Sequence, residues 1–387
     1  MARICSFVEQ LALARPRVLS TIQANSGRTL NIDAMRCAFC AVRAGNRKMS
    51  NRDTLNIEGF QFRGLDPHVF MGTASDRYAG WLGQIYSEQR YAGRISRRKK
   101  TIGGTAFLED VLPVESVEEY FQHFRVLELD FTFYRLLLEE GGEPTQNYHV
   151  LQKYRQYLQE GDNIILKVPQ VICAQKLWRR GQFVPNEGYL NSETFRRQFY
   201  EPAVDILGFA LTGLIFEQEY QRKKDRASPE AVAADLDTFF QEIPKDDRYH
   251  IELRTEPYLA SPVFDVLEKH GVGQVLSHWT WLPSIEKQFA KSGRRFLNSG
   301  GQSIVRLMTP RGTRYEEAYA KAHPFDALVD EMLNPGMVRE TVELMRTAID
   351  HGVRINIIVN NRAGGNAPLV GQQIARRFLE MSEASPS

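Results

Sequence analysis

Residues 164–168 read IILKV, residues 304–308 read IVRLM and residues 355–359 read INIIV. Each is a short, nearly continuous apolar run, which is typical of a parallel strand buried on both faces. Similar runs recur from residue 69 onward, and a stretch with helical periodicity follows each of them. The eight predicted strands are residues 69–75, 126–134, 163–169, 211–218, 249–255, 272–278, 302–310 and 353–361.

Helical stretches between these runs complete the pattern. Ser228-Pro229 places a proline at the first position of a predicted helix, and Ser116 with Glu119 matches a capping box. Strands that alternate with helices favour right-handed βαβ units, so we predict an α/β fold, a TIM-like (β/α)8 barrel. No glycine-rich nucleotide-binding motif follows a strand, which makes a doubly wound sheet the weaker alternative. The connection of about 50 residues after the first strand predicts an extended first βα loop.

The composition is that of an ordinary globular protein. The chain has 387 residues and a formal net charge of +2, and 43% of its residues are hydrophobic. Its longest largely apolar stretch, residues 206–216, is shorter than the roughly 20 residues that cross a membrane, so we expect a soluble protein. Four cysteines in so long a chain do not form a disulfide framework, which favours a cytoplasmic location. Cys37 and Cys40 form a lone C-x-x-C, compatible with metal or redox use or with two incidental thiols.

The basic residues are unevenly distributed along the chain. Residues 1–52 contain nine basic and two acidic residues, whereas the remaining 335 contain 40 basic and 45 acidic ones. We therefore predict a basic N-terminal extension over residues 1–66 and a single barrel domain over residues 67–387. An arginine-rich extension fits an organelle transit peptide, an arm that contacts nucleic acid, or flexible extra sequence.

Polar residues gather near the C-terminal ends of the predicted strands, where barrels of this kind have their active sites. Within residues 126–134, Glu128, Asp130, Thr132 and Tyr134 share one face by the two-residue period, and the opposite face is apolar. We expect the polar face to point into the barrel. Other strands add Lys167, Gln218, Glu252, Arg254, His278, Arg306, Asn360 and Asn361 to the same interior.

The charges of this interior are expected to cancel. A divalent metal would need a surplus of carboxylates and imidazoles, so we predict no metal and no cofactor. A paired network fits acid/base chemistry and a purely structural ion-pair core equally well. The carboxylates are those of Glu128, Asp130 and Glu252, and the cations are those of Lys167, Arg254 and Arg306.

Two further segments suggest contacts with anions. The turn RAGGNAP at residues 362–368 precedes the last predicted helix, where free N–H groups at the positive helix end would suit a phosphate or carboxylate. The residues predicted for this anion site are Arg311, Arg314, Gly364, Gly365 and Asn366. An ordinary glycine-rich turn is the alternative. The other segment is the basic cluster of the extended first loop, which fits a phosphate-binding lid or a solvated loop; its members are Arg90, Arg94, Arg97, Arg98, Lys99 and Lys100.

From Val69 to the C-terminus the chain resembles the family known as domain of unknown function 72, or YecE-like proteins. The order and spacing of several small motifs together carry the resemblance. These motifs are Gly72-Thr73 with Trp81, Glu128 with Thr132-Phe133-Tyr134, Lys167 with Pro169, Gly213 with Gln218, Glu252-x-Arg254, Arg306, and Asn360-Asn361 with Asn366-Ala367-Pro368. The resemblance implies a TIM-barrel-like fold with polar positions at the barrel mouth, and it implies no activity. The chain departs from the family pattern at Asp130, Thr255, Tyr258 and Arg362.

The leading hypothesis is an enzyme, a metal-independent hydrolase, lyase or isomerase that acts on a small anionic, phosphorylated or sugar-like molecule. Glu252 would be the general acid or base, oriented by Arg254, with Glu128 or Asp130 as the second carboxylate. Lys167 would stabilise negative charge. The residues predicted to bind the substrate are Thr73, Trp81, Thr132, Tyr134, Gln218, His278, Arg306, Asn360 and Asn361.

Two other hypotheses stay open at this point. The basic first loop could bind nucleic acid without cleaving it, in which case binding would weaken steeply with salt. Alternatively, the polar barrel could be a non-catalytic scaffold. The sequence leaves the substrate and the oligomeric state open.

Overall fold

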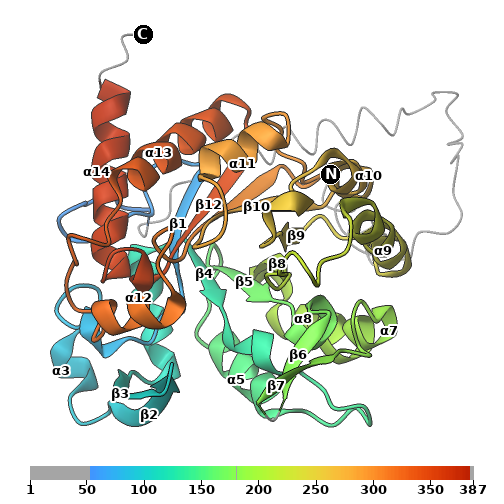
Figure 1. The fold of residues 1–387 in the computed structure, drawn as a ribbon. Coiled ribbons are helices and arrows are strands. Elements are labelled where there is room, and N and C mark those ends of the chain that lie inside the picture. The colour runs from blue at the N-terminus through green and yellow to red at the C-terminus, as the bar shows by residue number, and fades with distance from the viewer. Residues whose placement is uncertain (1–52, 180, 384–387) are drawn as a thin grey trace, which may run out of the picture. The chain divides into compact units, whose positions relative to one another are not determined.

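Eight parallel strands close into a barrel in the computed structural model, which describes residues 53–179 and 181–383 (Figure 1). The strands follow one another around the barrel in chain order, and the last pairs with the first. They are β1 (Val69–Ala74), β4 (Val126–Leu129), β5 (Asn163–Lys167), β8 (Leu211–Glu217), β9 (Tyr249–Glu252), β10 (Gly273–His278), β11 (Gln302–Leu307) and β12 (Arg354–Val359). The prediction of a TIM-like (β/α)8 barrel is confirmed, with all eight strands present.

Helices follow the strands and cover the barrel (Figure 1). The Ser228 side chain caps α9 by accepting a hydrogen bond from the N–H of Ala231 at 3.2 Å, as the sequence predicts. The capping box at Ser116 is not formed, because a 3-10 turn leads into α4 and the hydroxyl makes no capping bond. The helices are α3 (Glu88–Tyr91), α4 (Val117–His123), α5 (Gln146–Arg155), α6 (Gln170–Cys173), α7 (Ser192–Phe195), α8 (Glu201–Leu207), α9 (Pro229–Glu242), α10 (Ser261–His270), α11 (Ile285–Lys291), α12 (Tyr315–Ala322), α13 (Pro335–Asp350) and α14 (Ala367–Glu383). In the described part of the chain, no helix is long and apolar enough to cross a membrane.

The interior of the barrel includes two layers that shape its mouth. The first is an apolar cluster in which each buried Val or Ile contributes roughly 1.5–3 kcal/mol. Because every second side chain of a strand points the same way, residues two positions further along face the interior one layer higher. The apolar layer includes Phe70, Val126, Ile165, Ile215, Val275, Ile304 and Ile358. A polar layer lies above the apolar one, toward the C-terminal ends of the strands. Its members follow Val126, Ile165, Ile215 and Ile304 by two residues, and they are Glu128, Lys167, Glu217 and Arg306.

Two antiparallel hairpins enlarge the loops that follow β1 and β5. They are β2 (Ser96–Ile102) with β3 (Thr105–Val111), and β6 (Lys176–Arg179) with β7 (Gln182–Pro185). The first hairpin accounts for the extended first βα loop that the sequence predicts.

The folded part of the chain begins before residue 67. Residues 53–66, which the sequence analysis assigns to the extension, pack against the barrel: Phe62 is fully buried, and its ring centroid lies 5.2 Å from that of Phe124. Residues 1–52, with Cys37 and Cys40, lie outside the described residues.

Candidate functional site

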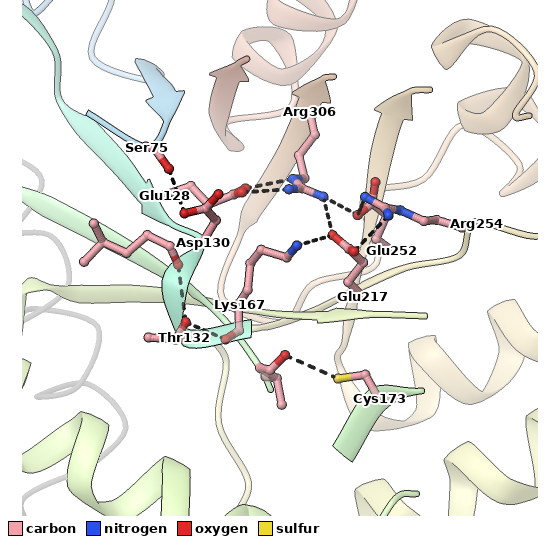
Figure 2. Close-up of polar contacts among 12 residues, drawn as sticks. Ser75, Glu128, Asp130, Thr132, Lys167, Cys173, Glu217, Glu252, Arg254 and Arg306 are labelled. Atoms are coloured by element: carbon pink, nitrogen blue, oxygen red, sulfur yellow. Dashed lines mark hydrogen bonds and ion pairs between the residues drawn. The ribbon is translucent and has the colours of Figure 1, made fainter. Parts of the chain in front are cut away.

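The polar layer of the barrel is organised around Arg306 on β11. Its Nε and Nη2 atoms donate to the two carboxylate oxygens of Glu128, at 2.7 and 2.6 Å (Figure 2). Its Nη1 atom donates to Oε2 of Glu217 at 3.0 Å and also to Oε2 of Glu252. Arg306, Glu128 and Glu252 have no exposed surface. One guanidinium group thus stands between three buried carboxylates.

Two further cations, Lys167 and Arg254, border this cluster on its solvent side. Lys167 Nζ lies 2.6 Å from Oε2 of Glu217, and Arg254 Nη1 lies 2.8 Å from Oε1 of the same residue. Each cation also lies over an aromatic ring, Lys167 over Phe133 at 3.9 Å and Arg254 over Trp279 at 4.9 Å from the centroid. The two side chains are 9% and 17% exposed. Glu217 and the aromatic rings therefore hold both cations, of which Lys167 is nearly buried and Arg254 is partly exposed.

The charges of this cluster balance, as a buried network requires. Burial alone would raise the pKa of Glu217, but the charges of Arg254, Lys167 and Arg306 outweigh burial and hold this pKa well below its ordinary value. Glu217 is therefore ionised at neutral pH and has no proton to give as a general acid. The six charged members are Glu128, Glu217, Glu252, Lys167, Arg254 and Arg306.

Asp130 lies beside this cluster and not within it. The strand predicted over residues 126–134 ends at Leu129, and Phe131–Tyr134 form a 3-10 turn, so the predicted alternation beyond Leu129 is wrong. Asp130 Oδ1 accepts a hydrogen bond from Ser75 Oγ at 2.7 Å, and the side chain is partly exposed. In the part of the chain that the structure describes, no cation forms an ion pair with it. Asp130 is thus an accessible carboxylate held by a hydroxyl.

The residue that holds Asp130 has an unusual backbone. Ser75 follows β1 with φ +67°, in the left-handed region that a residue with a Cβ atom rarely adopts. Its N–H donates to the carbonyl of Glu128 at 2.9 Å, and its carbonyl accepts from Thr73 Oγ1 at 2.7 Å. Such a conformation costs on the order of 1–3 kcal/mol and is frequent at functional sites.

Glu217 is the member of the cluster that the sequence analysis missed. The sequence pattern predicts Gln218 as the inward-facing residue of this strand. Glu217 follows the inward-facing Ile215 by two residues and lies in register with Glu252 on β9. A shift of one residue exchanges the two faces of a strand. The spacing from Ile215 is the signal that would have identified Glu217.

Most residues predicted to bind the substrate are buried and hold loops together. Trp81 Nε1 donates to Asn361 Oδ1 at 3.1 Å, and the same oxygen accepts from the N–H of Ala367 at 2.8 Å. Thr132 Oγ1 donates to the carbonyl of Lys167 at 2.7 Å. Tyr134, in contrast, is 70% exposed. The buried members of the predicted set are Thr73, Trp81, Thr132, Gln218, His278, Arg306, Asn360 and Asn361.

The glycine-rich turn at residues 362–368 lacks the free N–H groups that an anion site needs. The N–H groups of Gly364 and Gly365 donate to the carbonyl of Asn361, and that of Leu369 donates to Oδ1 of Asn366 at 2.9 Å. Gly364, Gly365 and Asn366 are buried, whereas Arg311 and Arg314 are exposed. These bonds favour the ordinary glycine-rich turn over an anion site.

The basic cluster of the first loop is largely neutralised by acidic partners. Five of its six members form ion pairs, with carboxylates on α4, on β3 and in the turn before α4. Exposed pairs of this kind contribute little to stability but reduce the positive charge available to a ligand. The pairs are Arg90 with Glu118 and Glu119, Arg94 with Glu115, Arg97 with Asp110, and Arg98 and Lys100 with Glu109.

A pocket of about 420 Å³ lies between the ends of β1 and β4 and the β2–β3 hairpin. Ser75, Asp76 and Asp130 line it on the barrel side, so it adjoins the mouth without including Lys167 or Arg254. The sequence analysis did not select Asp76. Its Oδ1 accepts from the hydroxyl of Tyr154 at 2.8 Å, its Oδ2 has no hydrogen-bond partner in the described part of the protein, and burial raises its pKa to about 6.

The described residues contain no group of three or more His, Cys, Asp or Glu side chains placed to hold a metal ion. The three carboxylates of the polar layer surround Arg306 instead.

A closed (β/α)8 barrel with charged side chains at the C-terminal ends of its strands is an architecture shared by many enzymes of small molecules. The chain belongs to the family described as protein of unknown function DUF72, which matches residues 70–386. This confirms the resemblance seen in the sequence.

Solved structures described as members of the same family are similar to the chain. The chain is similar to a DUF72 family protein from Thermotoga maritima, with 16% identity, a TM-score of 0.47, and coverage of 81% of this chain and 99% of that one. It is also similar to a DUF72 family protein from Enterococcus faecalis, with 13% identity, a TM-score of 0.46, and coverage of 82% and 97%. No curated protein matches the chain.

Proposed function

We propose that the barrel mouth is the active site of an enzyme that acts on a small anionic, phosphorylated or sugar-like molecule. The observation that carries this proposal is the difference in exposure within the charged cluster. Arg306, Glu128 and Glu252 are fully buried, whereas the side chains of Lys167 and Arg254 are 9% and 17% exposed. A buried network thus holds two cations in place at its edge, as preorganised stabilisation of negative charge requires.

Three side chains at the mouth have separate roles in the proposed reaction. Lys167 and Arg254 bind the negative group of the substrate, and the rings of Phe133 and Trp279 beside them offer apolar walls. Asp130 is the general acid or base, because it is partly exposed and its partner is the hydroxyl of Ser75. A carboxylate and two cations at one barrel mouth suit a hydrolase, lyase or isomerase.

Glu252 has a different role from the one its sequence position suggests. Its Oε2 atom is held by Arg306 and lies 3.3 Å from Arg254 Nη2, and the residue is fully buried. We therefore assign Glu252 to positioning Arg254, with Asp130 in contact with the substrate.

The proposed reaction needs no resident metal ion. Arg306 stands between Glu128, Glu217 and Glu252, where a divalent cation would otherwise find its ligands. Its guanidinium supplies the positive charge that these carboxylates require.

The nucleic-acid alternative that uses the basic first loop has less support. The ion pairs of this loop leave Lys99 as its one member without an acidic partner in the described residues. A phosphate backbone would have to displace those carboxylates before binding.

Two experiments test the proposal, the first of ligand binding and the second of turnover. Phosphorylated and carboxylated sugars, each with its neutral parent compound, are first screened by thermal shift and calorimetry. Ligands that bind are then followed for turnover by NMR. We expect the anionic members alone to bind, Lys167→Met to weaken binding, and Asp130→Asn to keep binding while lowering turnover about 10²–10⁴-fold.

Arg314→Met is the matched control, because this arginine is exposed and forms no ion pair among the described residues. It should change neither binding nor turnover. Equal binding of the neutral parent compounds, or unchanged turnover in Asp130→Asn, would contradict the proposal.

A further inference from the structure

Large apolar side chains are concentrated on the loops that follow the barrel strands. Eight of the ten exposed ones in the described residues lie in these connections. Five aromatic side chains, on the loops after β5, after its neighbour β8 and after β10, form what we call the aromatic face. They are Trp178, Phe183, Tyr220, Trp279 and Trp281. The chain has four tryptophans, so three of them lie on this face.

The loops of the aromatic face are joined to one another. Gln221 Nε2 donates to Gln175 Oε1 at 2.8 Å, which ties the loop after β8 to the start of the β6–β7 hairpin. The N–H of Gln175 donates to Glu219 Oε1 at 2.8 Å, and Lys176 pairs with Asp225 at 3.4 Å. The hairpin that carries Trp178 and Phe183 therefore lies against the loop that carries Tyr220.

The rings themselves form two groups with free faces. Trp178 and Phe183 meet edge to face with centroids 4.8 Å apart, yet they are 62% and 64% exposed. Tyr220 contacts Trp281, with centroids 5.8 Å apart, and also Trp279. Trp178, Phe183, Tyr220 and Trp281 are 44% to 64% exposed and so present ring surface to a planar ligand, whereas Trp279 is partly buried with Arg254 over its ring.

The same loops carry exposed cations that lack acidic partners. Arg179, Arg222, Lys223 and Lys224 are exposed and form no ion pair in the described part of the chain. Residues 175–187 and 218–228 together contain seven basic and three acidic residues, in a chain whose net charge is only +2. These loops differ in this respect from the basic cluster after β1, whose cations are paired.

We infer that the aromatic face binds single-stranded nucleic acid, with bases stacked on its rings and phosphates near Arg179 and residues 222–224. Stacked aromatic rings interleaved with unpaired cations are the combination by which proteins bind single strands without sequence preference. A duplex hides the faces of its bases within its own stack, so it would use only the cations. A neutral glucan would use only the rings. This binding does not require the reaction proposed at the mouth, and Trp279 is the one member of the face that also borders the proposed substrate site.

Fluorescence anisotropy of the full chain tests this inference. The probes are a labelled oligothymidylate of about 16 nucleotides, the matching duplex, polyglutamate and a soluble β-glucan. We expect the single strand to bind more tightly than the duplex or polyglutamate. Its affinity should fall between about 50 and 200 mM salt, with a log–log slope near −3 for four phosphate contacts. Tryptophan fluorescence should be quenched on binding, because Trp81 is the one tryptophan away from the face.

Variants of the rings separate stacking from simple charge attraction. Trp178→Ala and Trp281→Ala should each weaken binding of the single strand about 5- to 150-fold, which corresponds to the loss of one stacked base. The matched control is Phe209→Ala, because Phe209 is 59% exposed but precedes β8 and contacts Arg155. It should bind as the unaltered protein does.

Several results would overturn the inference. They are no binding of the single strand at about 50 mM salt, equal binding of the duplex or of polyglutamate, and unchanged affinity in both tryptophan variants. Binding of the glucan with the same dependence on Trp178 and Trp281 would show a carbohydrate surface instead. Circular dichroism establishes that each variant is folded, which the exposure of these side chains leads us to expect.

Discussion

Both carboxylate oxygens of Glu128 accept hydrogen bonds from Arg306, although 178 residues separate the two along the chain. Both side chains are completely buried. Two parallel N–H···O bonds of this type set direction as well as distance. The pair therefore fixes β4 and β11 across the barrel and orients the third guanidinium nitrogen toward Glu217 and Glu252.

Removal of the Arg306 charge should destabilise the protein strongly. Arg306→Met leaves three carboxylates buried without their shared cation, so we expect the free energy of unfolding to fall by about 3–5 kcal/mol. Urea denaturation followed by circular dichroism measures the change. Arg311→Met is the control, since Arg311 is exposed, and it should stay within about 0.5 kcal/mol of the parent. A loss below about 1 kcal/mol for Arg306→Met would contradict this account of the cluster.

Glu217→Gln should lower the stability of the fold more at neutral pH than at acidic pH. Because its neighbouring cations lower the pKa of Glu217 in the folded protein, the ionised carboxylate stabilises the fold above the ordinary pKa of 4.5. This stabilisation is lost as the pH falls toward the lowered folded-state pKa. The stability difference between parent and Glu217→Gln should therefore be largest near pH 7 and shrink below about pH 4.5. A difference that does not change with pH would rule out this role.

Asp76→Asn should show the opposite dependence. Burial raises the pKa of Asp76 from 3.8 to about 6, so the folded protein holds this proton more tightly than the unfolded chain does. The parent therefore loses stability as the pH rises from about 4 to 6, by about 3 kcal/mol, whereas the amide does not titrate. Across this pH range, the urea midpoint of Asp76→Asn should rise relative to that of the parent protein. A constant difference would mean that Asp76 titrates normally.

Two substitutions at Ser75 separate its backbone conformation from its hydrogen bond. Both Ser75→Ala and Ser75→Gly remove the bond to Asp130, but only glycine adopts φ +67° without strain. We expect the glycine variant to be more stable than the alanine variant by about 1 kcal/mol in urea denaturation. Equal stability of the two would show that the backbone at residue 75 relaxes on substitution.

The eight strands could be predicted because apolar runs such as residues 355–359 are buried on both faces whatever the details of the loops. The ends of the strands were less predictable. Polar alternation continues past Leu129 in the sequence, yet the chain turns into a 3-10 helix there, so Asp130 leaves the interior face. Similarly, a difference of one residue separates Gln218 from the inward-facing Glu217, and hydrophobicity alone does not distinguish them.

Whether the cations of a loop have acidic partners could not be predicted from local sequence. The arginines at residues 90–98 stand together in the chain, but their partners at residues 109–119 are brought to them by the β2–β3 hairpin and α4. The cations at residues 222–224 look less conspicuous in sequence and have no such partners in the described residues. The burial of Asp76 likewise depends on Tyr154, which lies 78 residues further along the chain.

The apolar layer beneath the charged cluster closes the barrel at one end. Val126, Ile165, Ile215 and Ile304 fill the interior below Glu128, Lys167, Glu217 and Arg306. This packed layer separates the cluster from the N-terminal end of the barrel. Water, protons and ligands therefore exchange with the cluster through the C-terminal opening. Sequence changes in the loops around that opening can alter what enters while leaving in place the five charged members of the cluster that lie on strands.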